Sequence, residues 1–288
     1  MEILDIRRLQ HFRANAYRTL PGARLHSREE AVEFVNQRGF IFFWPIKGIT
    51  MPSLWAAVAG ERQVADAHDD PGHVTWGWKD SLLGQRAWYY AKVLRKRATM
   101  ISMTDAPFFY ALSENYGSPE EDYLTLYEQG RLTLESKVVY EAILDHGPLD
   151  TVALRREAHM TSNESDSRFN RSLTDLQVDF KIVPIGVAQA GAWNYAFIYE
   201  VAARHYPELP EQAQHISARQ ARLHLAKRYL DSVGAMQARD LSLLFHWRPI
   251  DIERTLNHLV ESGEAIPGVQ IEGIKGESVV LPSLSDNE

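Results

Sequence analysis

Several features that would assign a chain to a known class are missing from this sequence. It has no cysteine, so disulfides, thiol nucleophiles, iron–sulfur clusters and cysteine-ligated zinc are excluded within it. Its longest nearly unbroken apolar run, residues 39–46, is far shorter than the roughly 20 residues that a membrane span needs. The first residues mix acids and arginines where a signal peptide would be apolar. We therefore expect a cytoplasmic protein with no membrane partner.

An excess of positive charge is also missing. The net charge of −7 argues against a protein that coats nucleic acid through bulk charge, so any nucleic-acid surface must be local. Phosphate-binding, dinucleotide-binding, serine-hydrolase and zinc-protease motifs are absent too, and we expect no cofactor. His68 and His73 lie five residues apart around a Pro-Gly pair, which fits no usual zinc spacing. They predict a surface loop and no metal site.

What is present is typical of a folded, mostly helical chain. The 288 residues are 45% hydrophobic and 24% charged, which favours two or three globular domains. Helix-capping residues precede apolar-periodic runs that end at glycine, and they predict helices over residues 28–38, 133–145 and 217–233. Residues 82–97 also resemble a helix. The apolar segment 40–44 is expected to be a buried strand.

A weak internal repeat occupies the second half of the chain. The stretch that begins at Gly147 and continues Pro-Leu-Asp-Thr-Val-Ala-Leu aligns with the one that begins at Gly234. Each copy predicts three helices followed by a β-hairpin, which is the order of a winged helix-turn-helix. The third helices are expected over residues 165–179 and 249–261. The predicted hairpins are 181–188 with 193–201 and 265–271 with 278–281. The predicted fold is mainly α with small β-hairpins (α+β), in tandem winged helix-turn-helix domains.

The third helix of such a unit buries one stripe and presents the opposite stripe to the DNA major groove. The residues expected on these outer faces are Arg168, Arg171, Ser172 and Asp175 in the first copy, and Asp251, Arg254, Thr255, His258 and the wing-turn Lys275 in the second. Both faces are polar and mildly basic. They fit either DNA contact or an ordinary solvated surface.

Residues 86–97, RAWYYAKVLRKR, form the strongest local basic segment. Its aromatic residues could stack on bases, but on a helix Trp88, Ala91 and Leu94 would form a core stripe, and we favour this structural role. The basic end of the segment is a candidate for phosphate contact, and it consists of Arg95, Lys96 and Arg97. Four further tryptophans are expected to be packing anchors, namely Trp76, Trp78, Trp193 and Trp247.

Several short stretches, in this order along the chain, resemble the AlkZ-like family of alkylpurine and crosslink-repair DNA glycosylases, from Arg7 to about Leu281. The matching stretches are Arg7-Arg8-Leu9, Trp76-Gly-Trp78-Lys-Asp, Tyr89-Tyr-Ala-Lys-Val-Leu94, Gly147 to Arg155, Trp193-Asn-Tyr-Ala-Phe197 and Pro207-Glu208. The resemblance implies three winged-helix units. We expect them over residues 1–117, where the unit is irregular, 118–212 and 213–288.

Members of that family hydrolyse the N-glycosidic bond of alkylated purines with a Gln-x-Asp or Gln-x-Gln pair. Such a pair orients the attacking water and offsets the charge of an oxocarbenium-like sugar. The resemblance implies that the two positions fall here on Phe42 and Trp44, neither of which can activate water. Nearby carboxylates are Asp66, Asp69 and Asp70, although their spacing identifies no pair. Aromatic residues at 40–44 could instead stack on a flipped base.

Three hypotheses follow from the sequence. The leading one is a DNA-binding protein related to these glycosylases that lacks their usual catalytic pair, with intact or damaged double-stranded DNA as its partner. The second is an active DNA glycosylase that uses a different water-activating residue. The third is a winged-helix interaction scaffold or transcriptional regulator, which the acidic net charge favours.

Overall fold

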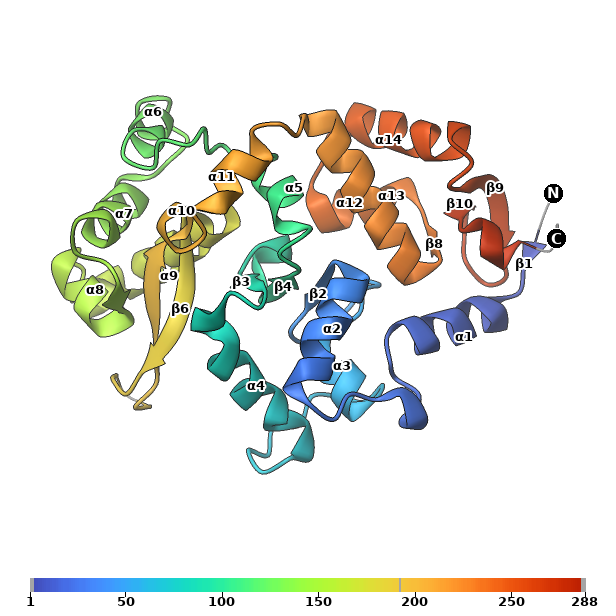
Figure 1. Ribbon diagram of the computed structural model, residues 1–288, viewed down its shortest axis with the longest axis horizontal. Coiled ribbons are helices and arrows are strands. Elements are labelled where there is room, and N and C mark those ends of the chain that lie inside the picture. Colours follow the sequence, from blue (N-terminus) through green and yellow to red (C-terminus); the bar gives the residue numbers. More distant parts are fainter. Residues whose placement is uncertain (1–2, 192, 286–288) are drawn as a thin grey trace. The chain divides into compact units, whose positions relative to one another are not determined.

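A computed structural model describes residues 3–191 and 193–285 of the chain (Figure 1). They form two compact units: unit 1 contains residues 1–76 and 218–288, and unit 2 contains residues 77–217. Unit 1 is therefore built from both ends of the sequence. The predicted division into segments 1–117, 118–212 and 213–288 concerns individual winged helices and stays a prediction.

Unit 1 combines an N-terminal set of helices with the second copy of the repeat. Its N-terminal elements are β1 (Ile3–Leu4), α1 (Ile6–Ala16), η1 (Pro21–Ala23), α2 (Arg28–Arg38), β2 (Phe40–Phe42), α3 (Leu54–Ala59) and η2 (Pro71–His73). Its C-terminal elements are α12 (Ala218–Val233), β8 (Ala235–Met236), α13 (Ala238–Phe245), α14 (Pro249–Glu261), β9 (Ile266–Ile271), β10 (Glu277–Val280) and η6 (Pro282–Leu284). Strand β1 pairs in parallel with β9, which closes a four-stranded sheet of order β1-β9-β10-β8.

Unit 2 begins within α4 (Val74–Leu82), where the boundary between the units falls. The next elements are η3 (Leu83–Gln85), β3 (Tyr89–Ala91), η4 (Leu94–Lys96), β4 (Thr99–Ile101), α5 (Ala106–Tyr110) and α6 (Asp122–Glu128). The first copy of the repeat follows as α7 (Leu134–His146), β5 (Leu149–Asp150), α8 (Thr151–Glu157), η5 (Asn163–Ser165), α9 (Asp166–Val178), β6 (Ile182–Ala188) and β7 (Ala196–Val201). The unit ends with α10 (Ala202–His205) and α11 (Glu208–Ala213).

The predicted repeat is present in the order and pairing of these elements. In each copy a long helix leads through a two-residue strand to two helices and a hairpin. The two-residue strand pairs antiparallel with the second strand of the hairpin in both copies, as β5 with β7 and as β8 with β10. The prediction of a mainly α fold with small β-hairpins (α+β) is confirmed.

Helix boundaries agree with the sequence where a cap or a proline defines them. The Ser27 hydroxyl accepts a hydrogen bond from the Glu30 amide at 3.2 Å and opens α2, which ends before Gly39 as predicted. Pro249 occupies the first turn of α14, whose bounds are those predicted from the sequence.

The helix predicted over residues 82–97 is wrong. That segment contains the end of α4, two short 3-10 turns and strand β3, which pairs antiparallel with β4. All three residues of β3, Tyr89, Tyr90 and Ala91, are buried, so a helix with one apolar stripe could not have covered them. The expected buried strand at residues 40–44 is present as β2 over residues 40–42, and Trp44 lies beyond it.

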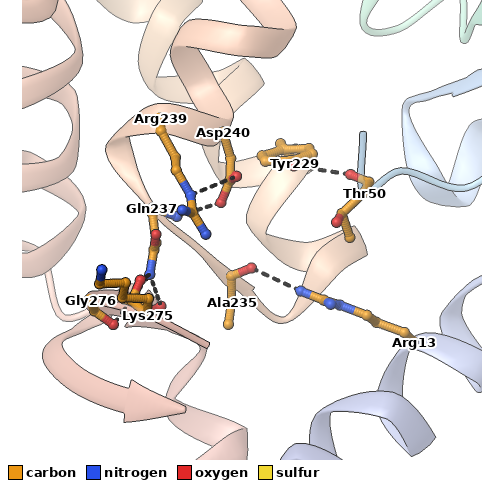
Figure 2. A network of polar contacts seen from close by, with 10 residues as sticks. Arg13, Thr50, Tyr229, Ala235, Gln237, Arg239, Asp240, Lys275 and Gly276 are labelled. Carbon is orange, nitrogen blue, oxygen red and sulfur yellow. Dashed lines mark hydrogen bonds and ion pairs between the residues drawn. The ribbon is translucent and has the colours of Figure 1, made fainter. Parts of the chain in front are cut away.

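Within unit 1, the N-terminal helix α1 packs against the C-terminal elements around Gly234. Arg13 of α1 donates from Nε to the carbonyl of Val233 at 2.8 Å, which caps the end of α12. Its Nη2 donates to the carbonyl of Ala235 at 3.2 Å (Figure 2). Gly234 between them has φ 75°, and a Cβ there would lie 2.8 Å from side-chain atoms of Phe12 and Leu284. A larger residue would separate these elements.

Candidate nucleic-acid interface

The outer face of α9 carries the first pair of predicted DNA-binding residues. Phe169, Leu173 and Leu176 are buried as predicted, whereas Arg168 and Arg171 are exposed. Arg168 forms an ion pair with Glu135 of α7 at 3.2 Å. Arg171 has no hydrogen bond or ion pair within the described residues, so its guanidinium is available to a ligand.

The exposed face of each third helix is narrower than the sequence predicts. Ser172 is buried because it lies three residues after Phe169 on the core stripe of α9. Thr255 of α14 is buried in the same way, and its hydroxyl donates to the carbonyl of Asp251 at 2.7 Å. Asp251 is itself buried. These three predicted outer residues therefore belong to the packed side of their helices.

The basic segment 95–97 lies against α9. Lys96 forms an ion pair through Nζ with Asp175 of α9 at 2.6 Å, and the Lys92 amide donates to Gln177 Oε1 at 3.1 Å. Arg95 and Lys96 both have φ 55°, so the chain reverses here in two left-handed residues. The structure thus brings two predicted sites, segment 95–97 and the α9 face, together on unit 2.

The aromatic residues of the same segment serve packing, as expected. Trp88, Tyr89 and Leu94 are buried, and the Tyr89 ring stacks on Phe180 with centroids 4.5 Å apart. Burial raises the pKa of Tyr89 well above its ordinary value, so the phenol stays neutral. These side chains therefore belong to the packed interior of unit 2.

In unit 1, α14 and α12 enclose a groove with a volume of about 490 Å³. Its lining residues are Arg219, Arg222, Leu223, Asp251, Arg254, Thr255, Asn257, His258 and Glu261. It contains the predicted residues Arg254 and His258, and Arg219 Nη2 lies 3.4 Å from His258 Nδ1. Arg254 makes no hydrogen bond or ion pair closer than 4 Å within the described residues. The groove combines three guanidinium groups with two carboxylates.

The carboxylate at the centre of this groove is held as an anion. Asp251 Oδ2 accepts from Arg248 Nε at 2.8 Å and lies 3.5 Å from Arg222 Nη2. The hydrogen bond from Arg248, together with the nearby charges of Arg222 and Arg254, holds the pKa of Asp251 below its usual value. Sequence reasoning missed Arg219 and Arg222, although their spacing of three residues on a predicted helix places both on one face.

Lys275 lies exposed in the turn between β9 and β10, as predicted. Figure 2 shows the Gln237 side chain pointing at this turn, where its Nε2 donates to the carbonyls of Lys275 and Gly276, both at 3.2 Å. The backbone N–H of Gln237 also donates to Asp240 Oδ2 at 2.7 Å, so the same residue caps α13. Gln237 therefore fixes the backbone of the turn that carries Lys275.

The positions that the family resemblance assigned to catalysis contain aromatic residues in different environments. Phe42 is buried in β2, and its amide donates to the carbonyl of Pro52 at 3.0 Å. Trp44 is 38% exposed and contacts Trp76 edge to face, with centroids 5.6 Å apart. Neither offers a group that accepts a proton from water.

The nearby carboxylates and histidines do not combine into a site. Asp70 Oδ1 accepts from Arg62 at 2.5 Å and from the Gly72 amide at 2.8 Å, so it caps a turn, while Asp66 and Asp69 are exposed. Exposed His68 fits the predicted loop, but His73 is half-buried and contacts the Trp55 ring. The described residues contain no group of three or more possible metal ligands.

Of the four tryptophans expected to be packing anchors, Trp193 is the exception. Trp247 stacks on Phe245 with centroids 4.3 Å apart, and Trp76 and Trp78 are half-buried. Trp193 is 91% exposed, so the prediction for it is wrong. It lies in the turn before β7, where no element covers it.

A family model and a solved structure both match this chain. A family model described as AlkZ related matches residues 25–246. Among solved structures, Streptomyces sahachiroi DNA glycosylase AlkZ matches with a TM-score of 0.59 and 15% identity, over 98% of this chain and 71% of that one. A comparison with curated proteins finds no match. Every helix within the described ranges is too short or too polar to span a bilayer. With most of its length matched by the family model, the chain belongs to the AlkZ-related family.

Proposed function

We propose that this protein binds double-stranded DNA, intact or damaged, through basic side chains on the third helix of each repeat. The observation that carries the proposal is that two exposed arginines occupy the same position in the third helix of each repeat. Helices α9 and α14 both have 13 residues, and Arg171 and Arg254 each occupy the sixth position. Neither forms a hydrogen bond or a close ion pair within the described residues. Membership of the AlkZ-related family supports the choice of DNA as partner.

Further cations extend the two surfaces. On unit 2 the proposed contacts are Arg95, Lys96, Arg97, Arg168 and Arg171, and on unit 1 they are Arg254, His258 and Lys275 with Arg219 and Arg222. Guanidinium and ammonium groups suit phosphate oxygens, whose neutralisation releases counterions from the duplex. Because the net charge is −7, we expect binding only at these local surfaces and a strong dependence on salt.

The proposal includes the architecture and location expected from the sequence. Each copy of the repeat is a winged helix in this proposal, and residues 1–117 contain a third, irregular unit. The protein acts in the cytoplasm, which cell fractionation would test.

Fluorescence anisotropy with one short duplex tests the proposal, titrated at low and moderate salt. Replacing Arg171 and Arg254 together with Glu should weaken binding at least tenfold and reduce the slope of log affinity against log salt by about 0.9 for each lost phosphate contact. Arg28→Glu is the control, because Arg28 is an exposed arginine of α2 that already pairs with Glu29. Equal binding by the double variant and the wild type would contradict the proposed surface.

A further inference from the structure

The groove of unit 1, where α12 and α14 pack side by side, contains more positive than negative charge (Figure 1). Its lining includes three guanidinium groups and two carboxylates, those of Arg219, Arg222, Arg254, Asp251 and Glu261. One of the carboxylates is already bound from outside this lining, because Asp251 Oδ2 accepts from Arg248 Nε at 2.8 Å. Four arginines therefore surround two carboxylates.

Most hydrogen-bond donors of the three lining arginines are unused within the described residues. Arg222 forms an ion pair with Asp251 at 3.5 Å, and its Nε is buried with no acceptor. Arg254 makes no hydrogen bond or close ion pair there, and the polar contact of Arg219 is with His258 Nδ1 at 3.4 Å. A buried donor without an acceptor is unfavourable, so these groups gain when an anion enters the groove.

The three guanidinium groups converge on one stretch of the groove. Across the two helices Arg219 contacts His258, and Arg222 contacts Asp251. Arg254 lies between these two levels of α14, about one helical turn from each. Like charges this close repel one another, so the cluster lowers stability unless a ligand neutralises it.

A groove of unit 2 shows that lining cations need not be left unpaired. It has a volume of about 320 Å³, and the cations in its lining are Lys96 and Arg131. Lys96 forms an ion pair with Asp175, which lines the same groove, and Arg131 forms one with Glu114. Each of these cations has a carboxylate of its own, whereas Arg254 of the α12–α14 groove has none.

We propose that the groove between α12 and α14 binds the phosphate monoester at the end of a DNA strand. The inference rests on the proposed binding to DNA and names the part of the DNA that this groove takes. A terminal phosphate has three free oxygens and a charge of about −1.5 to −2 near neutral pH, so each of three guanidinium groups meets an oxygen. A phosphate within a strand has two free oxygens and one charge, and it matches fewer of these groups.

The size and position of the groove suit a strand end. Its volume of about 490 Å³ falls within the roughly 300–1,000 Å³ of small-molecule sites, so a phosphate can enter together with its sugar. The exposed amide of Asn257 offers a donor and an acceptor to that sugar. Glu261 lies one turn beyond His258 and repels a phosphate from that end of the groove. A continuous strand would have to bend to place a phosphate between two helices, whereas a free end enters directly.

The test is fluorescence anisotropy with three duplexes that contain the same one-nucleotide gap. The edges of the gap carry a 5′-phosphate, a 3′-phosphate or hydroxyl groups only. Wild-type protein should bind one of the phosphorylated duplexes about tenfold more tightly than the hydroxyl duplex. Arg219→Gln should remove this preference and keep or raise the midpoint of thermal unfolding, because it relieves repulsion among like charges. Arg28→Gln removes the same charge from an exposed arginine of α2, and as the matched control it should keep the preference.

A variant of unit 2 separates this inference from the proposed function. Arg171→Gln should weaken binding to all three duplexes by the same factor and keep the preference for the phosphorylated end. Equal wild-type affinity for the three duplexes would overturn the inference and leave the proposed duplex binding standing. A preference that survives Arg219→Gln would also overturn it.

A competition experiment tests whether the ligand is a strand end or a free nucleotide. Unlabelled phosphorylated duplex and thymidine 5′-monophosphate each compete with the labelled duplex, and the unlabelled duplex should compete at far lower concentration. Equal potency of the mononucleotide would assign the groove to a free nucleotide and overturn the strand end as its ligand. A wild type that binds none of the duplexes would refute both proposals.

Discussion

At the scale of single residues, the exposure of Trp193 contradicts its expected role as a buried packing residue. Tryptophan has a large apolar surface and is usually buried in part, yet this ring is 91% exposed in a hairpin turn. Stacking of an aromatic ring on a base contributes about 1–3 kcal/mol to binding. A base is easiest to reach where the base that would pair with it on the opposite strand is missing. Trp193→Ala should therefore weaken binding to a duplex with an abasic-site mimic about 5- to 100-fold, and weaken binding to the intact duplex less.

The control for this prediction is Tyr116→Ala, because Tyr116 is another exposed aromatic residue of unit 2, at 76%. Anisotropy titrations of both variants with both duplexes provide the comparison. An equal loss on the two duplexes would mean that Trp193 contributes only general affinity and does not recognise a gap in the base stack.

A second residue gives unit 2 a pH dependence. His205 of α10 is half-buried beside the ring of Tyr206, and burial lowers its pKa below 6.5, with Arg86 acting in the same direction. As the pH falls through 6.5, the unfolded state takes up a proton that the folded state does not yet bind. The free energy of unfolding therefore falls with pH until the lower folded pKa is passed.

Replacing this residue, as His205→Gln, should make the acid side of the stability curve shallower, even if it lowers stability at neutral pH. Urea unfolding at pH 7.5 and pH 5 measures both effects. His68→Gln, at an exposed loop histidine of unit 1, is the control and should leave the curve unchanged. The same pH dependence in His205→Gln as in the wild type would assign the effect to other groups.

At the scale of elements, sequence reasoning succeeded where one residue type has one structural use. Ser27 and Pro249 mark helix starts whatever surrounds them, and the bounds of α2 and α14 follow. The helix predicted for segment 86–97 is wrong because its apolar residues fit a helical stripe as well as a fully buried strand. Only the pairing of β3 with β4 decides between the two. The hydrogen bond from Lys79 Nζ to the Tyr195 hydroxyl could not be predicted, because the two residues lie 116 positions apart in the chain.

Gln237 gives a prediction for the hairpin of unit 1. Its side chain holds the turn at Lys275 and Gly276, and its backbone takes part in the cap of α13. Gln237→Ala should destabilise the protein by about 1 kcal/mol and speed amide exchange at residues 275–278. It should also lower duplex affinity as much as Lys275→Ala does. Gln10→Ala, at an exposed position of α1, is the control, and exchange rates that match it would show that the clamp is dispensable.

At the scale of the whole molecule, the two copies of the repeat differ in what completes them. The first copy lies within the continuous segment of unit 2, whose own residues supply its core. The second needs the N-terminal segment: β1 adds to its sheet, Arg13 caps α12, and Gly234 allows Leu9 and Phe12 to approach closely. The stretches aligned at Gly147 and Gly234 suggest two equivalent copies. The two copies nevertheless differ in whether their own residues complete the core.

This difference predicts how fragments of the chain behave. Residues 74–217, which keep all of α4, should unfold cooperatively on their own, because their buried residues contact one another. Residues 213–288 alone should unfold without a clear transition, because the surfaces that pack on α1 and β1 would meet water. Adding residues 1–76 as a separate chain should restore a transition. Thermal unfolding followed by circular dichroism measures all three, and a cooperative transition of 213–288 alone would instead support that segment as a self-sufficient domain.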